Sequence, residues 1–378
     1  MHGAPHDFHH TAAHHLVWQE TGFGEARLAV FGSHSRYVAW PYLLRRIELT
    51  GPGGEQDLYD ITAVDGYSGP VFVGCSPGEP FMACALRSIF ETWREARVVS
   101  VFARFHPLLM NQLCFQESAD SLLPCPSLPG LRHEGHTVSM DLRITDAEAR
   151  REYRESHLRH IKRAIRHGLT TEIDNSAASL DEFVRLYHQT MRRNNASPHY
   201  FFSHQFLERL RQSLALGVSI HLARLEGKAV AAVFITEFSG IVQYLLGGAD
   251  EAVYHLSPLK LLLDGVRRWA RARGNHTFHL GGGRRCQDED PLFYFKAGFS
   301  NRRHCFYTGR WILDQELYDQ LSGGRSRQPE ADMDYFPAYR TPLNEECRVV
   351  QDRSIEVQRV NETKEDPLCA NSRSPVQP

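Results

Sequence analysis

The segment VSIHLARLEGKAVAAVFITEFSGIVQYLLGGA, residues 218–249, decides the fold because it joins three apolar runs by two tight turns. One turn is the tripeptide EGK at 226–228, and the other is Ser239-Gly240. Short turns that contain glycine between apolar runs are typical of β-hairpins. We therefore predict an antiparallel meander whose strands are 218–225, 229–238 and 241–249.

The residues after the meander predict a well-defined helix and then another strand. Ser257 suits the N-cap position, Pro258 suits the first helical position, and Gly274 stands where the helix should end. The elements expected next are a strand at 276–280, the triple glycine 281–283, a short helix at 291–298 capped by Asp290, and a last strand at 303–313.

On the N-terminal side of the meander, the apolar patterns predict a mixture of strands and helices. Apolar residues at helical spacing mark 80–96, and β-branched and aromatic residues mark 97–105 as a strand. Prolines and glycines between residues 121 and 135 break both periods and indicate a connection between domains. The other strands expected are 26–32, 35–43 and 136–144, and the other helices are 146–167, 179–193 and 203–215.

These patterns predict an α+β protein with two domains, in which mixed and mostly antiparallel sheets are flanked by helices. The chain has 378 residues, of which 42% are hydrophobic, and this is enough for two cores of ordinary size. The expected divisions are a disordered N-terminus over 1–14, a first domain over 15–135, a second domain over 136–321, and a disordered tail over 322–378.

The composition argues against several classes of protein. The formal net charge is -2, so no global positive field attracts nucleic acid or an anionic membrane. The eight cysteines contain no C-x-x-C pair, which favours reduced thiols in the cytoplasm. No long apolar run or signal peptide is visible, so we expect no membrane span. We expect no metal site, because the histidines near the N-terminus lie in a segment predicted to be loose.

Four short motifs between residues 59 and 299 combine polar residues, glycines and one lysine. They are YDIT at 59–62 with GYSGP at 66–70, HLRHIKRAIRHGL at 157–169, LGGG at 280–283, and FKAGF at 295–299. Each is weak alone, but together they resemble the elements YD…YGYGGP, R…I.KA.K.G, LGG and FK.GF of the Fem branch of the GNAT acyltransferases. The resemblance implies two tandem GNAT-like domains and the transfer of an acyl or aminoacyl group to an amine.

Lys296, in the last of these motifs, is the first candidate for a catalytic residue. Only five of the 43 basic residues are lysines, and Lys296 stands among aromatic residues. A protonated lysine there could stabilise the oxyanion of acyl transfer or bind a donor phosphate. The alternative is a surface lysine whose stem covers the aromatic rings. The general base stays open between Asp65, Tyr244 and Glu237, and the acceptor amine can also lose its proton to water.

The activated donor is expected at the helix start near residue 258 and at the triple glycine. GNAT acetyltransferases usually bind the coenzyme A pyrophosphate with a glycine-containing loop, whereas residues 252–257 read AVYHLS. A helix start still offers N–H groups to a phosphate, although it can equally be an ordinary capped helix. Acyl-coenzyme A and aminoacyl-tRNA therefore both remain possible co-substrates, with no permanently bound cofactor. The candidate donor-binding residues are Leu256, Ser257, Lys260, Gly281, Gly282 and Gly283.

The acceptor is expected at the first motif and at the basic face of the 157–169 helix. The candidates are Asp60, Tyr67, Ser68, Lys162 and Arg163. The alternatives are a hairpin loop and a solvated helix face. The resemblance implies a small amine acceptor on an amino sugar, sugar nucleotide or peptide precursor of the cell envelope, with tRNA as a partner if it carries the donor. A rival from another class is a non-catalytic GNAT-like module that binds an envelope glycan or peptide.

Overall fold

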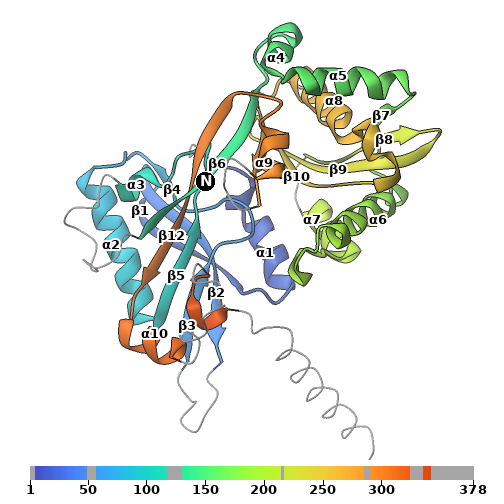
Figure 1. Ribbon diagram of the computed structural model, residues 1–378. Helices are drawn as coiled ribbons and strands as arrows, with labels where there is room; N and C mark the ends of the chain where they lie inside the picture. The colour runs from blue at the N-terminus through green and yellow to red at the C-terminus, as the bar shows by residue number, and fades with distance from the viewer. Residues whose placement is uncertain are drawn as a thin grey trace, which may run out of the picture. The chain divides into compact units, whose positions relative to one another are not determined.

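The computed structural model in Figure 1 describes residues 5–48, 57–116, 130–213, 217–284, 290–323 and 335–341. Residues Met1–Tyr318 form one compact unit, and this unit contains the whole sheet. Most of the predicted interdomain connection and most of the predicted C-terminal tail lie outside the described residues. In the described part of the chain, no helix combines the length and the hydropathy that crossing a membrane would need.

Each predicted strand has a counterpart, and the chain also forms three strands (58–62, 71–73 and 170–173) and three helices (12–20, 113–116 and 315–322) that the sequence analysis does not predict. The strands are β1 (Glu25–Ser33), β2 (Arg36–Ile47), β3 (Leu58–Thr62), β4 (Val71–Val73), β5 (Val98–Arg104), β6 (Leu131–Asp141), β7 (Thr170–Ile173), β8 (Gly217–Leu225), β9 (Lys228–Phe238), β10 (Ile241–Ala249), β11 (Thr277–Gly282) and β12 (Arg302–Ile312). The helices are α1 (Ala12–Glu20), α2 (Pro80–Glu95), α3 (Leu113–Gln116), α4 (Asp146–Glu152), α5 (Glu155–Arg166), α6 (Ala177–Arg193), α7 (His204–Ser213), α8 (Pro258–Ala272), α9 (Pro291–Lys296) and α10 (Gln315–Ser322).

One sheet runs through both halves of the unit in the order β1-β2-β3-β5-β12-β6-β11-β10-β9-β8-β7, with β4 beside β2. Its named strands pair antiparallel except β3 with β5 and β10 with β11. The predicted α+β class with a mostly antiparallel sheet and flanking helices is confirmed. The predicted domain boundary at 135 and 136 falls inside β6, and β12 lies between β5 and β6. The division into two tandem domains stays a prediction.

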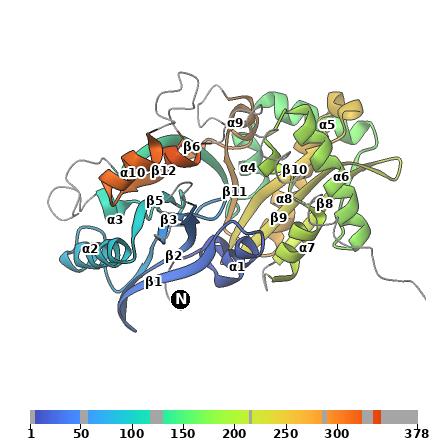
Figure 2. The same ribbon diagram turned by 90° about the horizontal axis from the view of Figure 1, so that it is seen from below.

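The second half of the sheet is buried on both faces, and β9 shows why. Its residues Ala231, Val233 and Ile235 belong to the core that includes α8. The intervening Ala232 and Phe234 belong to the core that includes α6 and α7. Because neighbouring strand residues point to opposite faces, a strand that is apolar throughout needs a helix on each side. Figures 1 and 2 show α5, α6 and α8 gathered around this half of the sheet.

The first half of the sheet packs against α2 (Figure 2) through large aromatic side chains. Trp40 of β2, Trp93 of α2 and Trp311 of β12 are all at most 4% exposed. The Trp40 ring lies 5.1 Å from that of Trp93 and 5.9 Å from that of Trp311, in edge-to-face arrangements. Such pairs add to the stabilisation that the burial of their area provides.

The single helix predicted over 146–167 is wrong, because the chain forms two helices that are separated at Tyr153. Tyr153 has extended backbone angles, and its buried hydroxyl donates a 3.0 Å hydrogen bond to Asp264 Oδ1. The backbone N–H of Arg154 then donates to the carbonyl of Gly298 at 2.8 Å. Partners more than a hundred residues away therefore turn the chain where the local pattern would continue one helix.

The N-terminus also differs from the prediction of a disordered segment over 1–14. Residues Phe8–His10 form a 3-10 helix, and α1 follows directly. Phe8, His9 and His10 are all 0% exposed, and helix α1 packs on α7, β1 and β2. The histidines that looked typical of a loose terminus are interior residues.

Candidate functional site

The central strands β10 and β11 separate, and the predicted residues Lys296, Tyr244 and Gly281 lie at this point. The two strands pair in parallel only over Ile241–Gln243 and Thr277–His279. Beyond these residues β10 continues along β9 with a register shift after Tyr244, and β11 continues along β6 with a shift after His279. Helix α9 packs against β11 and β6 beside this separation.

Lys296, the last residue of α9, is a nearly buried cation at this place. Its side chain is 8% exposed. Its Nζ donates a hydrogen bond to the carbonyl oxygen of Gly282 at 2.8 Å and lies 5.4 Å from the centre of the Tyr244 ring. Burial lowers the pKa of Lys296 to about 8, and the carboxylate of Asp290 partly offsets this effect. The ammonium group is therefore still mainly charged at neutral pH, and it has protons left to donate.

The three glycines of the LGGG motif leave room for the groups around Lys296. A Cβ placed on Gly281 would lie 3.3 Å from Lys296 Nζ and 3.3 Å from the hydroxyl oxygen of Tyr67. These two polar groups therefore approach one common point above Gly281, whose φ of +75° also favours glycine. At Gly283, a Cβ would lie 2.6 Å from Oδ1 of Asp290, the residue that caps α9. The structure thus brings together Lys296, Tyr67, Tyr244 and the triple glycine.

The three candidates for a general base have different surroundings. Burial raises the pKa of Tyr244, so its hydroxyl stays protonated at neutral pH and does not act as a base there. Asp65 is in the loop after β3, half exposed, and 3.7 Å from Nη1 of Arg104. Glu237 lies at the end of β9 and accepts hydrogen bonds from Arg273 at 2.9 Å and from Asn275 at 2.7 Å. Its carboxylate therefore has structural partners there.

Two candidates for acceptor binding have structural partners. Asp60 is completely buried in β3, and its Oδ1 accepts a 2.6 Å hydrogen bond from Nε of Arg45. Ser68 is also buried, and its carbonyl oxygen accepts a 2.7 Å hydrogen bond from Asn111. Of the first motif, Tyr67 reaches the glycine motif, because its hydroxyl oxygen would lie 3.3 Å from a Cβ on Gly281.

The remaining candidates lie at the start of α8 and on α5. Ser257 was expected to cap α8, but it adopts a left-handed conformation with φ of +55° and makes no side-chain cap hydrogen bond. Leu256 is part of the core. Lys260 Nζ donates to Nδ1 of His160 on α5 at 2.7 Å, and burial lowers the pKa of this lysine. Lys162 and Arg163 are exposed on α5. These residues form a second group, separate from the Lys296 group.

A cluster of buried polar residues beside the strand separation was missed by the sequence analysis. Its members come from the N-terminal segment, the end of β5, β10 and β11, namely Asp7, His9, His106, Gln243 and His279. All are at most 3% exposed. The His279 ring packs 5.2 Å from that of Tyr67, so the cluster adjoins the Lys296 group. The histidine-rich start of the chain was a signal, but its partner His106 stands about a hundred residues away.

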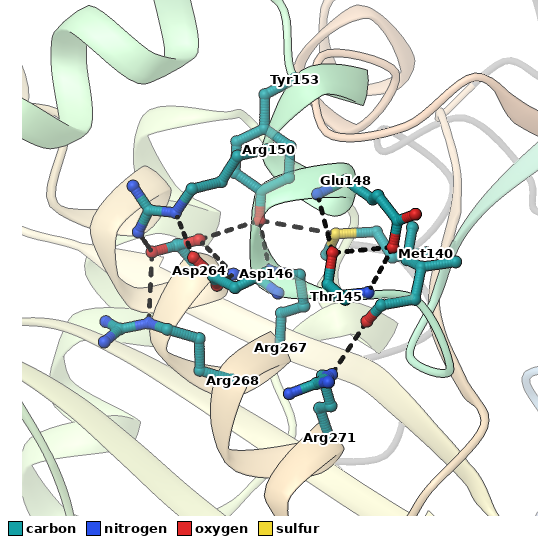
Figure 3. Close-up of polar contacts among 11 residues, drawn as sticks. Met140, Thr145, Asp146, Glu148, Arg150, Tyr153, Asp264, Arg267, Arg268 and Arg271 are labelled. Atoms are coloured by element: carbon teal, nitrogen blue, oxygen red, sulfur yellow. Dashed lines mark hydrogen bonds and ion pairs between the residues drawn. The ribbon is translucent and has the colours of Figure 1, made fainter.

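A second buried polar cluster surrounds Asp264 of α8 and is drawn in Figure 3. The completely buried Asp264 carboxylate accepts hydrogen bonds from Arg150 at 2.8 Å, Tyr153 at 3.0 Å and Arg267 at 3.2 Å. Arg267 is 1% exposed and also pairs with Asp146. The cluster ties α4 to α8, and every charge in it faces an opposite charge.

The chain is similar to known acyltransferases in sequence and in fold. Residues 151–293 match the family described as acetyltransferase (GNAT) domain. A relative from Weissella viridescens, UDP-N-acetylmuramoylpentapeptide-lysine N(6)-alanyltransferase, is 26% identical over 164 residues, which is 43% of this chain and 48% of the relative. The matched region thus spans about half the length of that relative.

Two solved structures share the fold. The crystal structure of FemX aligns with a TM-score of 0.62 and 13% identity over 84% of this chain and 95% of that chain. The C-terminal domain of a putative lysylphosphatidylglycerol synthetase from Agrobacterium fabrum aligns with a TM-score of 0.50 and 15% identity, over 81% of this chain and 88% of that chain. At these identities the likeness shows the architecture.

Proposed function

We propose that the chain is an N-acyltransferase, because residues 151–293 match the GNAT acetyltransferase family and the fold resembles that of FemX. It transfers an acyl or aminoacyl group from an activated donor to an amine on a peptide or sugar precursor of the cell envelope. The name of the Weissella viridescens relative makes the ε-amine of a lysine in UDP-N-acetylmuramoyl-pentapeptide the first acceptor to try.

The observation that carries the proposal is the nearly buried ammonium group of Lys296 beside the triple glycine. In acyl transfer the acceptor nitrogen attacks the carbonyl carbon of the donor ester or thioester, and negative charge develops on the carbonyl oxygen. A desolvated ammonium group stabilises that oxygen more strongly than one in water. The tetrahedral intermediate then expels the alcohol or thiol of the donor, which takes up the proton that the amine loses. In this proposal Tyr67, whose hydroxyl approaches the same point above Gly281, donates a further hydrogen bond.

The start of α8 supports aminoacyl-tRNA as the donor over acyl-coenzyme A. Residues 252–257 contain no glycine, and the backbone N–H groups of Ser257 and Lys260 already donate to the carbonyls of Tyr254 and Ser257. This leaves little free backbone for a pyrophosphate cradle. In this proposal the exposed Lys162 and Arg163 contact the phosphates of the acceptor.

The test is a transfer assay with UDP-N-acetylmuramoyl-pentapeptide and either alanyl-tRNA or acetyl-coenzyme A, in which mass spectrometry follows the acceptor. We expect a mass increase of one alanine with alanyl-tRNA, and its loss in Lys296→Met. Lys228→Met is the matched control, because Lys228 is an exposed lysine paired with Asp250. Acetylation instead would identify coenzyme A as the donor carrier. Acceptor binding without any product from either donor would favour the non-catalytic module.

A further inference from the structure

Three side chains with metal-binding atoms meet in the interior beside Gln243 and His279. Oδ2 of Asp7 lies 3.0 Å from Nδ1 of His9 and 3.1 Å from Nε2 of His106. The three atoms lie within 4.8 Å of one another, and each of the three residues is 0% exposed. They join the N-terminal segment to the end of β5, across about a hundred residues of sequence.

The carboxylate of Asp7 faces histidines and no arginine or lysine among the ion pairs of the described residues. Burial of an unpaired carboxylate is costly, and the two histidines that pair with Asp7 are charged only when they are protonated. If both imidazoles are neutral and donate to Asp7 Oδ2, one negative charge remains in the interior. The second carboxylate oxygen, Asp7 Oδ1, is buried and has no hydrogen-bond partner among the described residues. The Asp264 cluster, by contrast, neutralises its carboxylate with arginines.

The spacing of the three atoms suits a small tetrahedral cation. Zinc binds imidazole nitrogen at about 2.0–2.1 Å and carboxylate oxygen at about 2.0–2.2 Å, so neighbouring ligand atoms around it are about 3.3 Å apart. The two separations from Asp7 Oδ2, 3.0 and 3.1 Å, need only small shifts to reach this value, and the two histidine nitrogens lie within 4.8 Å of each other. Gln243 supplies a fourth ligand, because its side-chain amide contacts Asp7 Oδ2 and a rotated amide presents oxygen in place of nitrogen.

We propose that Asp7, His9 and His106 bind one structural zinc ion, with Gln243 as the fourth ligand. Two neutral imidazoles, a carboxylate and an amide oxygen form a tetrahedral set, and the complete burial leaves no open position for water, as structural sites require. The ion neutralises the carboxylate and fixes the segment that precedes α1 to the sheet. It thereby holds the histidines against the ring of Tyr67. The centre of that ring lies 5.8 Å from the ring centres of His9 and His106.

A second group of possible ligands provides the matched control. His133, His136 and Cys305 lie on the neighbouring strands β6 and β12, and their ligand atoms also lie within 4.8 Å of one another. His133 and Cys305 are exposed. A metal there would have a thiolate ligand, which the Asp7 cluster lacks, so spectroscopy distinguishes the two places.

The test measures the metal content of the full chain, purified through a tag without histidine and dialysed against metal-free buffer. We expect about one zinc ion per chain in the wild type and in Cys305→Ser, and less than about a tenth of that in His106→Gln. Because His106→Gln can fail to fold, the wild type is also stripped with a chelator and titrated with Zn²⁺. The melting temperature should fall on stripping and recover with one equivalent of zinc.

Cobalt substitution then identifies the ligands. We expect the visible absorption of tetrahedral Co²⁺ without the thiolate-to-cobalt charge-transfer band. The proposal is overturned if the wild type neither contains zinc nor gains thermal stability from it. It is equally overturned if the thiolate band appears, or if Cys305→Ser loses the metal while His106→Gln keeps it.

Discussion

Lys296 and Arg267 are both cations in the interior, but the protein treats them in opposite ways. Arg267 is 1% exposed and faces Asp264 and Asp146, and its pKa is raised above the usual value because the effects of Tyr153 and the two carboxylates together exceed the cost of burial. Lys296 is 8% exposed, donates to one carbonyl, and has its pKa lowered to about 8 by burial. The first charge stabilises the fold, whereas the second is held in the interior at a cost.

The difference indicates which charge serves a ligand. A buried cation with complete partners has nothing left to offer, and its removal leaves anions unpaired. A buried cation with incomplete partners is tolerated where strain or desolvation serves binding or catalysis. The two residues therefore predict opposite mutational results, and four experiments test the contrast.

The largest effect is expected from Asp264→Ala, which removes the acceptor that three donors share in Figure 3. Arg267 would remain buried with Asp146 as its remaining acid, so we expect the free energy of unfolding to fall by about 3–5 kcal/mol. Chemical denaturation measures it. The control is Asp57→Ala, which breaks an exposed pair with Arg46 and should cost about 0–1 kcal/mol. Equal effects in the two variants would show that the buried cluster is not a scaffold.

Lys296→Met should lower the activity strongly, whereas the thermal stability should stay level or rise. Removal of one group that stabilises an oxyanion lowers turnover by about 10²–10³-fold. The melting temperature at pH 7 should stay level or rise, because methionine has a similar length and no charge to desolvate. The folded-state pKa lies below that of an unfolded lysine, so this gain is complete below about pH 8 and shrinks as the pH rises toward the unfolded value. A large loss of stability would instead show that Lys296, like Arg267, stabilises the fold.

The elements of the second half could be predicted from the sequence because their signals are local. The meander, the apolar stripe of α8 and the order of the last two strands depend on neighbouring residues. The motif pair LGGG and FKAGF could also be found, because its members lie near each other in sequence and meet at Lys296 and Gly282, which are 14 residues apart.

The parts that could not be predicted depend on distant partners. The break at Tyr153 depends on Asp264, and the burial of Asp7 depends on His106 and Gln243. No periodicity in residues 5–15 reports a partner that far along the chain. The expectation of a loose terminus followed from composition, and composition does not reveal which polar side chains will find partners in the interior.

Tyr153→Phe tests the same cluster more gently. The hydroxyl donates to Asp264 Oδ1 and accepts from Nε of Arg267 at 2.8 Å, so its removal leaves both groups short of one partner. We expect a loss of about 1–3 kcal/mol in the free energy of unfolding, with the ring still in place. Turnover should follow the fraction of folded protein. A variant that is as stable as the wild type but loses turnover would show that Tyr153 serves the active site and not the stability of the fold.

The smallest effect is a pH dependence that depends on the charge of Lys296. If the ammonium form stabilises the transition state, its contribution to kcat/KM falls about tenfold per pH unit above a pKa of about 8. Deprotonation of the acceptor amine changes the rate in the opposite direction and can hide this fall. Comparison with Lys296→Arg removes that difficulty, because a guanidinium group keeps its proton over this range and both enzymes use the same acceptor. The ratio of kcat/KM of Lys296→Arg to that of the wild type should be constant below pH 8 and rise above it. If the ratio stays constant up to pH 9.5, roughly one and a half units above that pKa, the charge of Lys296 is not used in the transition state. The contrast with Arg267 would then concern stability alone.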